Sequence, residues 1–299
     1  MANRERGVFF QLLVSGLVLG GIYSMIALGY SLIYKASGLM SFVQGDILTL
    51  GAFLGLTFYS WLGFPFAASL VFTISITFLL GMFIEWGIIR KLVGKRNLAP
   101  IYVVLATIAA SYIIQNSSQV VWGTSALHFP PLFKTATVKI IAREVQMESI
   151  FCIIFAAGMM GILHFFMKYT RLGTSMRAAA MDPLAARACG INVYLNTGIT
   201  WGLAAGLAAL GGMLIGPVYG VYSMLGATIG RKGFSSAVIG GYGNMYGAMV
   251  GGLLLGLMET FVAGYISSSY KDIIGFMVLL IFLFLKPTGI FNETAITRQ

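Results

Sequence analysis

Charged residues are scarce in this sequence. They make up 9% of its 299 residues, while 58% are hydrophobic; soluble domains carry about 25% charged residues. A soluble fold of this size could not bury so much apolar surface, so we expect membrane lipid to surround much of the chain. The net charge of +10 does not indicate nucleic-acid binding, because the basic residues lie in short stretches between apolar runs. That pattern is typical of loops beside membrane helices.

Cysteine and histidine are also rare. Cys152 lies in an apolar run and Cys189 in a basic stretch, so we expect no disulfide. His128 and His164 have no metal-ligating partner at helical spacing. The chain has no Walker A sequence and no Gly-rich nucleotide loop after a strand. We therefore expect no metal, no cofactor and no energy source within the chain.

Long apolar runs dominate what is present. A helix that crosses a membrane needs roughly 20 apolar residues. Eight such runs are predicted to be membrane helices: Phe9–Tyr34, Phe42–Leu62, Phe66–Ile89, Pro100–Val121, Ile150–Met167, Tyr194–Ile215, Tyr246–Ile266 and Ile273–Leu285. The stretch 217–244 is interrupted by Pro217, Arg231 and Lys232, and predicts either a short ninth crossing or a re-entrant segment. The predicted fold is all-α: one polytopic membrane helix bundle over residues 1–299, with eight to nine transmembrane helices.

The basic residues predict an orientation. Lys and Arg follow the first, third and fifth predicted helices, at Lys35, Arg90, Lys91, Lys95, Arg96, Lys168, Arg171, Arg177 and Arg187. Because cytoplasmic loops carry an excess of Lys and Arg, we place these loops inside and the N-terminus outside. The external loop 122–149 then faces outward, with a β-like alternation near its end. Nine crossings would also place Lys286 and Arg298 inside, which favours nine over eight.

The polar segment 168–193 predicts a short helix outside the membrane. Asp182 followed by Pro183 is typical of an N-cap and first turn, and Gly190 of a C-terminal stop. Leu184–Cys189 between them suits a helix, and one this short is marginal in water. Either the membrane surface or a partner protein must hold it. From spacing alone, an ordinary basic loop at the lipid headgroups remains the alternative.

Four segments carry a family resemblance. Residues 172–193 read LGTSMRAAAMDPLAARACGINV and resemble the coupling loop of ABC importer permeases. Residues 16–46, 238–260 and 285–291 read GLVLGGIYSMIALGYSLIYKASGLMSFVQGD, VIGGYGNMYGAMVGGLLLGLMET and LKPTGIF. In this order they resemble the branched-chain amino acid ABC permease family. Where that family has Asn-Phe-Ala-His-Gly-Glu, this chain has Ser41, Phe42, Val43, Gln44, Gly45 and Asp46, which leaves the exact substrate open.

The resemblance implies a function and partners. It implies the permease subunit of a bacterial ABC importer in the inner (plasma) membrane, with a path for a small polar solute such as a branched-chain or other amino acid. The implied partners are a homologous permease subunit in a heterodimer, two cytoplasmic ABC ATPases and a periplasmic or external substrate-binding protein. The chain itself would not be an enzyme. The residues implied to couple it to the ATPases are Arg177, Asp182, Pro183, Leu184, Arg187, Gly190 and Asn192.

Polar and small residues within the apolar runs are candidates for the translocation path, because polar groups there usually face a cavity or the bundle interior. The candidates are Ser41, Gln44, Gly45, Asp46, Gly241 and Asn244. Gln44 and Asp46 either line the path or bond a broken helix junction, which Gly38 and Gly45 would permit.

Other small and charged residues predict helix packing. Gly247 and Gly251, four residues apart, predict close packing of helices, with a path lined by backbone as the alternative. Glu85 is expected to pair with Arg90, and Glu259 to need a partner that the sequence does not identify.

Two other classes of function remain to be weighed. A secondary transporter or channel for small polar solutes such as urea or amides would need intramembrane carboxylates or a pore motif. The chain has nine acidic residues, and few lie within the apolar runs. A membrane-embedded enzyme would need a catalytic cluster, and no His/Asp or Ser-His-Asp arrangement is present.

Overall fold

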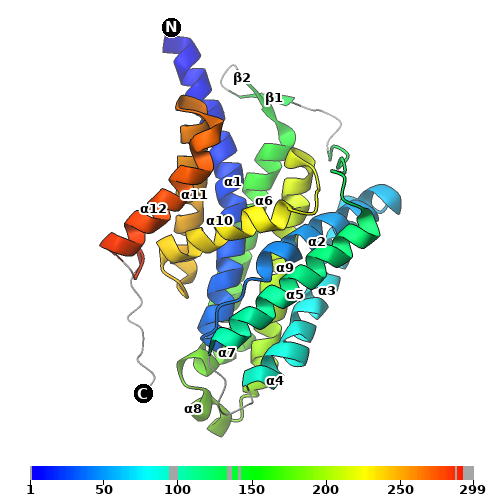
Figure 1. Ribbon diagram of the computed structural model, residues 1–299, viewed down its shortest axis with the longest axis vertical. Coiled ribbons are helices and arrows are strands. Elements are labelled where there is room, and N and C mark those ends of the chain that lie inside the picture. Colours follow the sequence, from blue (N-terminus) through cyan, green and yellow to red (C-terminus); the bar gives the residue numbers. More distant parts are fainter. Residues whose placement is uncertain (1, 94–99, 133–136, 141–142, 287, 292–299) are drawn as a thin grey trace.

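The computed structural model describes residues 2–93, 100–132, 137–140, 143–286 and 288–291. Lys95, Arg96, Arg298 and parts of loop 122–149 lie outside that range. The helices are α1 (Ala2–Ser37), α2 (Gln44–Leu56), η1 (Thr57–Trp61), α3 (Phe66–Ile84), η2 (Glu85–Ile89), α4 (Arg90–Val93), α5 (Pro100–Trp122), α6 (Met147–Tyr169), α7 (Arg171–Met181), α8 (Pro183–Ala188), α9 (Val193–Tyr219), α10 (Leu225–Gly240), α11 (Met245–Tyr265), η3 (Ser268–Tyr270) and α12 (Lys271–Leu285) (Figure 1).

Seven helices in the described part of the chain are long and apolar enough to cross a membrane. They are Gly7–Ser37, Phe66–Val93, Ile101–Trp122, Met147–Tyr169, Val193–Tyr219, Met245–Tyr265 and Ser268–Leu285. The chain is therefore a helical membrane protein, as predicted. The predicted count of eight to nine is not reached by this measure, because α2 and α10 are not among the seven.

One small sheet interrupts the helical fold. Strands β1 (Thr137–Ile140) and β2 (Arg143–Gln146) pair antiparallel, from Thr137 opposite Gln146 to Ile140 opposite Arg143. The bundle itself is all-α, as predicted, and the hairpin lies in the stretch of the external loop where the sequence shows a β-like alternation. The hairpin lies at the end of the molecule where α1 begins, away from α7 and α8 (Figure 1).

The ambiguous stretch 217–244 contains α10. Pro217 does not end the preceding helix, because it lies inside α9, which continues to Tyr219. The helix ends before Gly220, which has a φ of 75°. Helix α10 spans 16 residues and runs at a large angle to the upright α1 (Figure 1). It is too short to cross a membrane along the normal, since a span needs about 20 residues.

Helix α9 forms the centre of the bundle. It lies between α2 and α3, where glycines allow very close contacts. A Cβ on Gly212 would lie 2.0 Å from the Leu48 carbonyl oxygen, and one on Gly81 would lie 2.6 Å from that of Trp201. Trp201 is itself fully buried. Small residues let the backbones approach, which is how helices pack in lipid without a hydrophobic driving force.

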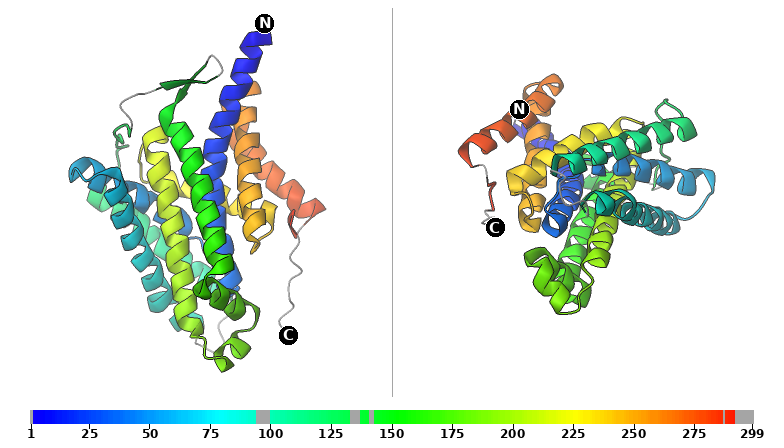
Figure 2. Two further views of the ribbon diagram at one scale, coloured as in Figure 1. Left: turned by 180° about the vertical axis from the view of Figure 1, so that it is seen from behind. Right: turned by 60° about the horizontal axis from the view of Figure 1, so that its bottom comes forward.

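The glycines of α11 pack against two neighbouring helices. A Cβ on Gly256 would lie 2.3 Å from the Gly20 nitrogen on α1, and one on Gly251 would lie 2.2 Å from the Ser236 carbonyl oxygen on α10. Figure 2 shows α1 and α11 side by side. The predicted close packing of this Gly-rich run is confirmed.

Candidate functional site

The start of α2 lies inside the bundle. Helix α1 ends at Ser37, next to Gly38 with its φ of 69°, and α2 begins at Gln44. A Cβ on Gly29 would lie 3.4 Å from Gln44 Oε1. Gly29 precedes the end of α1 by about 12 Å of helix, at about 1.5 Å per residue. The connecting segment therefore returns along α1 before α2 starts.

Three polar side chains at this point have atoms without a hydrogen-bond partner among the described residues. Ser41 Oγ, both amide atoms of Gln44 and Asp46 Oδ1 are buried and make no hydrogen bond with the described residues. Gln44 is 0% exposed and Asp46 is 6% exposed. The other Asp46 oxygen, Oδ2, accepts a hydrogen bond from Ser111 Oγ of α5. Because unpaired buried polar groups are costly, this cluster is suited to a polar guest.

A cavity of about 400 Å³ lies beside this cluster. It is bounded by α1, α2, α5, α10 and α12. Its lining residues are Tyr30, Phe42, Gly45, Asp46, Ile108, Ser111, Tyr112, Gln115, Gly226, Ala227, Gly230, Arg231, Phe234, Ser235, Phe276 and Leu279. The lining therefore combines one carboxylate and one guanidinium with aromatic and aliphatic side chains. Of the six predicted path residues, Gly45 and Asp46 line this cavity, and Ser41 and Gln44 are buried near it.

Gly45 brings α2 against α10. A Cβ at Gly45 would lie 2.4 Å from the Gly226 carbonyl oxygen, and one at Gly230 would lie 2.7 Å from the Gly45 Cα. Thr49 Oγ1 accepts a hydrogen bond of 2.7 Å from the Gly226 N–H. The predicted helix break lies at Gly38, which follows the end of α1 with a φ of 69°, whereas Gly45 lies within regular helix and takes no part in it. What it permits is the helix crossing that closes one side of the cavity.

The last two predicted path residues lie elsewhere and shape a turn. Gly241, with a φ of 109°, follows the end of α10 and contacts the C-terminal segment at Gly289 and Phe291. Asn244 caps α11, accepting hydrogen bonds from the N–H groups of Tyr246 and Gly247, both at 3.0 Å. Neither residue lines the cavity of α2 and α10.

A buried charge network lies beside the cavity on α10. Lys232 Nζ is 2.8 Å from Glu259 Oε2 of α11 and 2.7 Å from Asp272 Oδ1 of α12. Tyr23 of α1 donates a 3.0 Å hydrogen bond to Glu259. The sequence indicated that Glu259 needs a partner, and the structure identifies Lys232 and Tyr23. Four helices thus meet at one ion cluster, which holds α10 in place.

The segment 168–193 contains two helices. Asp182 Oδ1 accepts hydrogen bonds from the N–H groups of Leu184 (2.8 Å) and Ala185 (3.0 Å), which caps α8. Gly190 has a φ of 81° just beyond its end. The local geometry is that predicted from Asp182, Pro183 and Gly190, while docking to an ATPase stays a prediction. Sequence reasoning missed α7, the helix of 11 residues that precedes α8.

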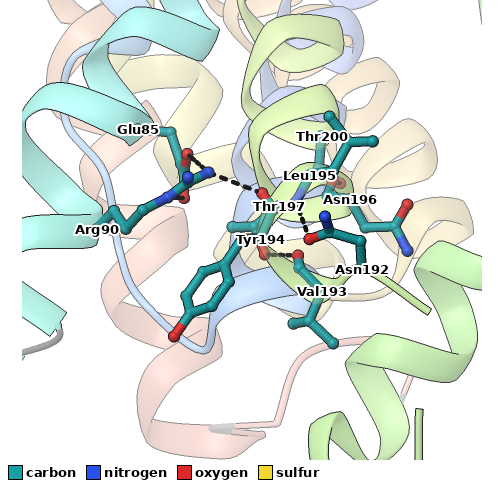
Figure 3. A network of polar contacts seen from close by, with 9 residues as sticks. All are labelled: Glu85, Arg90, Asn192, Val193, Tyr194, Leu195, Asn196, Thr197 and Thr200. Carbon is teal, nitrogen blue, oxygen red and sulfur yellow. Dashed lines mark hydrogen bonds and ion pairs between the residues drawn. The ribbon is translucent and has the colours of Figure 1, made fainter. Parts of the chain in front are cut away.

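Tyr194 joins α8 to α4. The Arg187 guanidinium lies 4.9 Å and that of Arg90 5.1 Å from the centre of its ring. Arg90 also pairs with Glu85 at 2.9 Å, as predicted, and donates to the Tyr194 carbonyl oxygen at 3.1 Å (Figure 3). Asn192 caps α9 by accepting a hydrogen bond of 3.1 Å from the Leu195 N–H. Arg177 is exposed and donates to the Lys168 carbonyl oxygen at 3.3 Å.

These features define a class: a multi-span membrane bundle with an internal cavity of mixed polarity and a pair of short helices at one end. Residues 12–283 match the family described as "Branched-chain amino acid transport system / permease component". The chain belongs to this family.

Curated relatives match the chain over nearly its whole length. The high-affinity branched-chain amino acid transport system permease protein LivH of Escherichia coli K12 is 31% identical, over 97% of each chain. The corresponding protein BraD of Pseudomonas aeruginosa is 32% identical, over 97% of this chain and 98% of BraD. No solved structure is significantly similar to the chain.

Proposed function

We propose that this chain is the permease subunit of an ATP-driven importer of branched-chain or other amino acids in the prokaryotic plasma membrane. The family match over residues 12–283 carries this proposal. Membership makes the chain a transport component, so the ATP is hydrolysed by partner subunits. The cavity beside the start of α2 is the proposed part of the translocation path, since buried polar groups within membrane helices usually face such a path.

The proposed topology has nine membrane segments in a single domain, residues 1–299. Seven are the membrane-length helices. The other two are α2 with η1, and α10, which is tilted and reaches only part of the way across the membrane. Figure 1 supports the first part of this topology: the N-terminus and the β-hairpin, with α1, α2, α3 and α5 between them in the chain, lie at one end of the molecule, and α4, α7 and α8 lie at the other. The basic end is the proposed cytoplasmic side, and loop 122–149 faces outward.

Helix α8 is the proposed contact to a cytoplasmic ATPase. Its Leu184 is 76% exposed, and Met181 just before it is 68% exposed. Large apolar side chains exposed outside the membrane are typical of a protein interface when they are rimmed by polar groups. Arg177 and Arg187 provide that rim. Each importer would hold this chain, a homologous permease, two such ATPases and an external substrate-binding protein.

The function is tested by uptake in the native host. Disruption of the gene for this chain should abolish high-affinity uptake of labelled leucine, isoleucine and valine, and re-expression should restore it. An affinity tag on the chain should recover an ATPase and a second permease. If all three amino acids are still taken up at the normal rate after disruption, the proposal is refuted.

The secondary transporter or channel is not favoured. The Lys232 amine is paired with Glu259 and Asp272 within the structure, so this cluster is closed by its own members. A coupling ion needs carboxylates that are open to a path. Asp46 is the one carboxylate among the residues that line the cavity, and a single carboxylate without an acidic partner does not favour proton or sodium coupling.

A further inference from the structure

We propose that the cavity between α2 and α10 binds the zwitterionic head of an α-amino acid, with Asp46 facing its ammonium group and Arg231 its carboxylate. This proposal rests on the proposed function, because it assigns the substrate of that path to particular side chains. The evidence is a pair of opposite charges that line one cavity and lack full pairing within the described chain.

Asp46 is the acidic member of the pair. It lines the cavity and is 6% exposed, and its Oδ1 makes no hydrogen bond to any residue that the structure describes. Ser111, which also lines the cavity, donates to the other carboxylate oxygen and fixes its orientation. An ionised carboxylate accepts hydrogen bonds and donates none. A ligand ammonium group supplies the donors that this carboxylate lacks.

Arg231 is the basic member. It lines the cavity and is exposed, and its guanidinium makes no hydrogen bond or ion pair within the described residues. The neighbouring Lys232 is fully engaged by Glu259 and Asp272. An arginine on the cavity wall that no described residue holds is available to an anionic ligand. The planar fork of arginine matches a carboxylate in two parallel hydrogen bonds.

The helix crossing brings the two charges together. Gly45 and Gly230 are in backbone contact, since a Cβ on Gly230 would lie 2.7 Å from the Gly45 Cα. Asp46 and Arg231 each follow one of these glycines in the chain, and consecutive Cα atoms are about 3.8 Å apart. The Cα atoms of the two charged residues therefore lie within about 12 Å of each other, and both residues line the cavity. An α-amino acid carries its two charges on one carbon, which suits such a close pair.

The rest of the cavity suits an aliphatic side chain. Phe42, Ile108, Phe234, Phe276 and Leu279 supply apolar surface around the charged pair. The volume of about 400 Å³ falls within the range of small-molecule sites, roughly 300–1,000 Å³. We expect a zwitterion with an apolar side chain to bind better than an analogue that lacks either charge.

The test is protection of a cysteine placed in the cavity. Ala227→Cys puts a thiol on the cavity wall, and Cys189→Ser removes the exposed native thiol while Cys152 stays buried. The full importer, isolated from its native host in membrane vesicles, is treated with a small thiol reagent. L-leucine should slow modification of Cys at 227. Neither 4-methylpentanoate, which lacks the ammonium group, nor isoamylamine, which lacks the carboxylate, should protect at the same concentration.

Charge-removing variants then assign the two ends. Asp46→Asn and Arg231→Gln should each raise the leucine concentration for half-protection by about tenfold or more, because a charged hydrogen-bond partner is lost. Asp46→Glu and Arg231→Lys should retain part of the protection. If one neutral variant fails to assemble, the other decides the outcome. As a control, Leu203→Cys in the separate apolar cavity of α3, α6 and α9 should be unaffected by leucine.

The outcomes separate this proposal from the proposed function. If the wild-type importer accumulates leucine but leucine does not protect Cys at 227, the assignment of this cavity is wrong. It is equally wrong if both neutral variants are protected like the wild type. If the wild-type importer accumulates no amino acid, the proposed function fails instead.

Discussion

At the scale of single residues, Lys232 occupies the most demanding position. It lies between Glu259 and Asp272 at 2.8 and 2.7 Å, and Glu259 is 2% exposed. Removing one member of a buried ion pair leaves an uncompensated charge, which costs more than the pair itself contributes. The stability of α10 against α11 and α12 therefore depends on this one amine.

Lys232→Met should strongly destabilise the protein. We expect a loss of about 3–5 kcal/mol, because Glu259 then remains buried without its cation. The measurement is thermal unfolding in detergent, followed by tryptophan fluorescence. The double variant Lys232→Met with Glu259→Gln should recover part of the loss, and Tyr23→Phe should cost much less. Equal unfolding temperatures for wild type and Lys232→Met would contradict a structural role for the network.

Gly226→Ala should separate α2 from α10. The new methyl group would lie 1.9 Å from the Gly45 carbonyl oxygen, so the backbones must move apart. Overpacking of this kind costs about 1–3 kcal/mol, and here it also opens the cavity wall, so uptake should fall with stability. The matched control is Gly158→Ala on α6, where no atom lies within 4 Å of the added carbon. That variant should keep full uptake; similar uptake by both would mean that the crossing is unimportant.

Residue roles were predictable from the sequence where the partners are local. Glu85 and Arg90 are five residues apart, and Asp182 caps the helix that it precedes. The partners of Glu259 were not predictable, because Lys232 and Tyr23 lie 27 and 236 residues away. Arg231 was read as an interruption of an apolar stretch, since nothing in the sequence brings it next to Asp46. That proximity depends on the contact between Gly45 and Gly230.

At the scale of elements, α8 depends on its cap. The helix has six residues, and Asp182 accepts both of its first free N–H groups. Helices this short are marginal in water without further support. The orientation of Leu184, the exposed apolar side chain, therefore depends on the side chain of Asp182.

Asp182→Ala should uncouple the importer without unfolding the bundle. Loss of an N-cap costs about 0.5–2 kcal/mol, and here the cost falls on α8 alone. We expect ATP-dependent uptake to fall severalfold while the unfolding temperature of the bundle stays unchanged. Asp182→Ser preserves the cap but removes the charge, so it should keep most of the activity. If the serine variant fails as badly as the alanine variant, the charge matters and the cap does not.

The elements themselves were largely predictable, because apolar runs in a membrane must form helices. The short helices were less so. Helix α7 was read as a loop because its polar face dominates its composition; Gly173 and Met176 on its other face pack against the bundle. Helix α10 was ambiguous because Arg231 and Lys232 interrupt its apolar pattern, and only the network explains why they lie within a helix.

At the scale of the whole molecule, charge is distributed unevenly between the two ends. Helices α4, α7 and α8, with their arginines and lysines, lie opposite the N-terminus and the β-hairpin (Figure 2). The sequence predicted this separation from loop charges alone. The basic stretches share one end because an even number of membrane segments separates each from the next along the chain. The start of α2 inside the bundle does not change that number.

Cys189 should react from the cytoplasmic side only. Cys189 is exposed beside α8, while Cys152 is buried. Labelling of Cys189 therefore shows on which side of the membrane the α8 end of the molecule lies. A membrane-impermeant maleimide should label inside-out vesicles and leave intact cells unlabelled. Ser125→Cys combined with Cys189→Ser places the thiol at the opposite end and should give the reverse result. Labelling of Cys189 in intact cells would invert the proposed orientation.

The most direct test of the account replaces α8 in the assembled importer. Residues Asp182–Gly190 are exchanged for a flexible Gly/Ser linker of equal length, and ATP-dependent uptake of labelled leucine is measured in proteoliposomes that contain the binding protein and both ATPases. The account predicts that the permease remains folded, with its unfolding temperature preserved, while the ATPases dissociate and uptake is lost. A complex that stays assembled and imports leucine at the wild-type rate would contradict the claim that α8 couples this bundle to ATP.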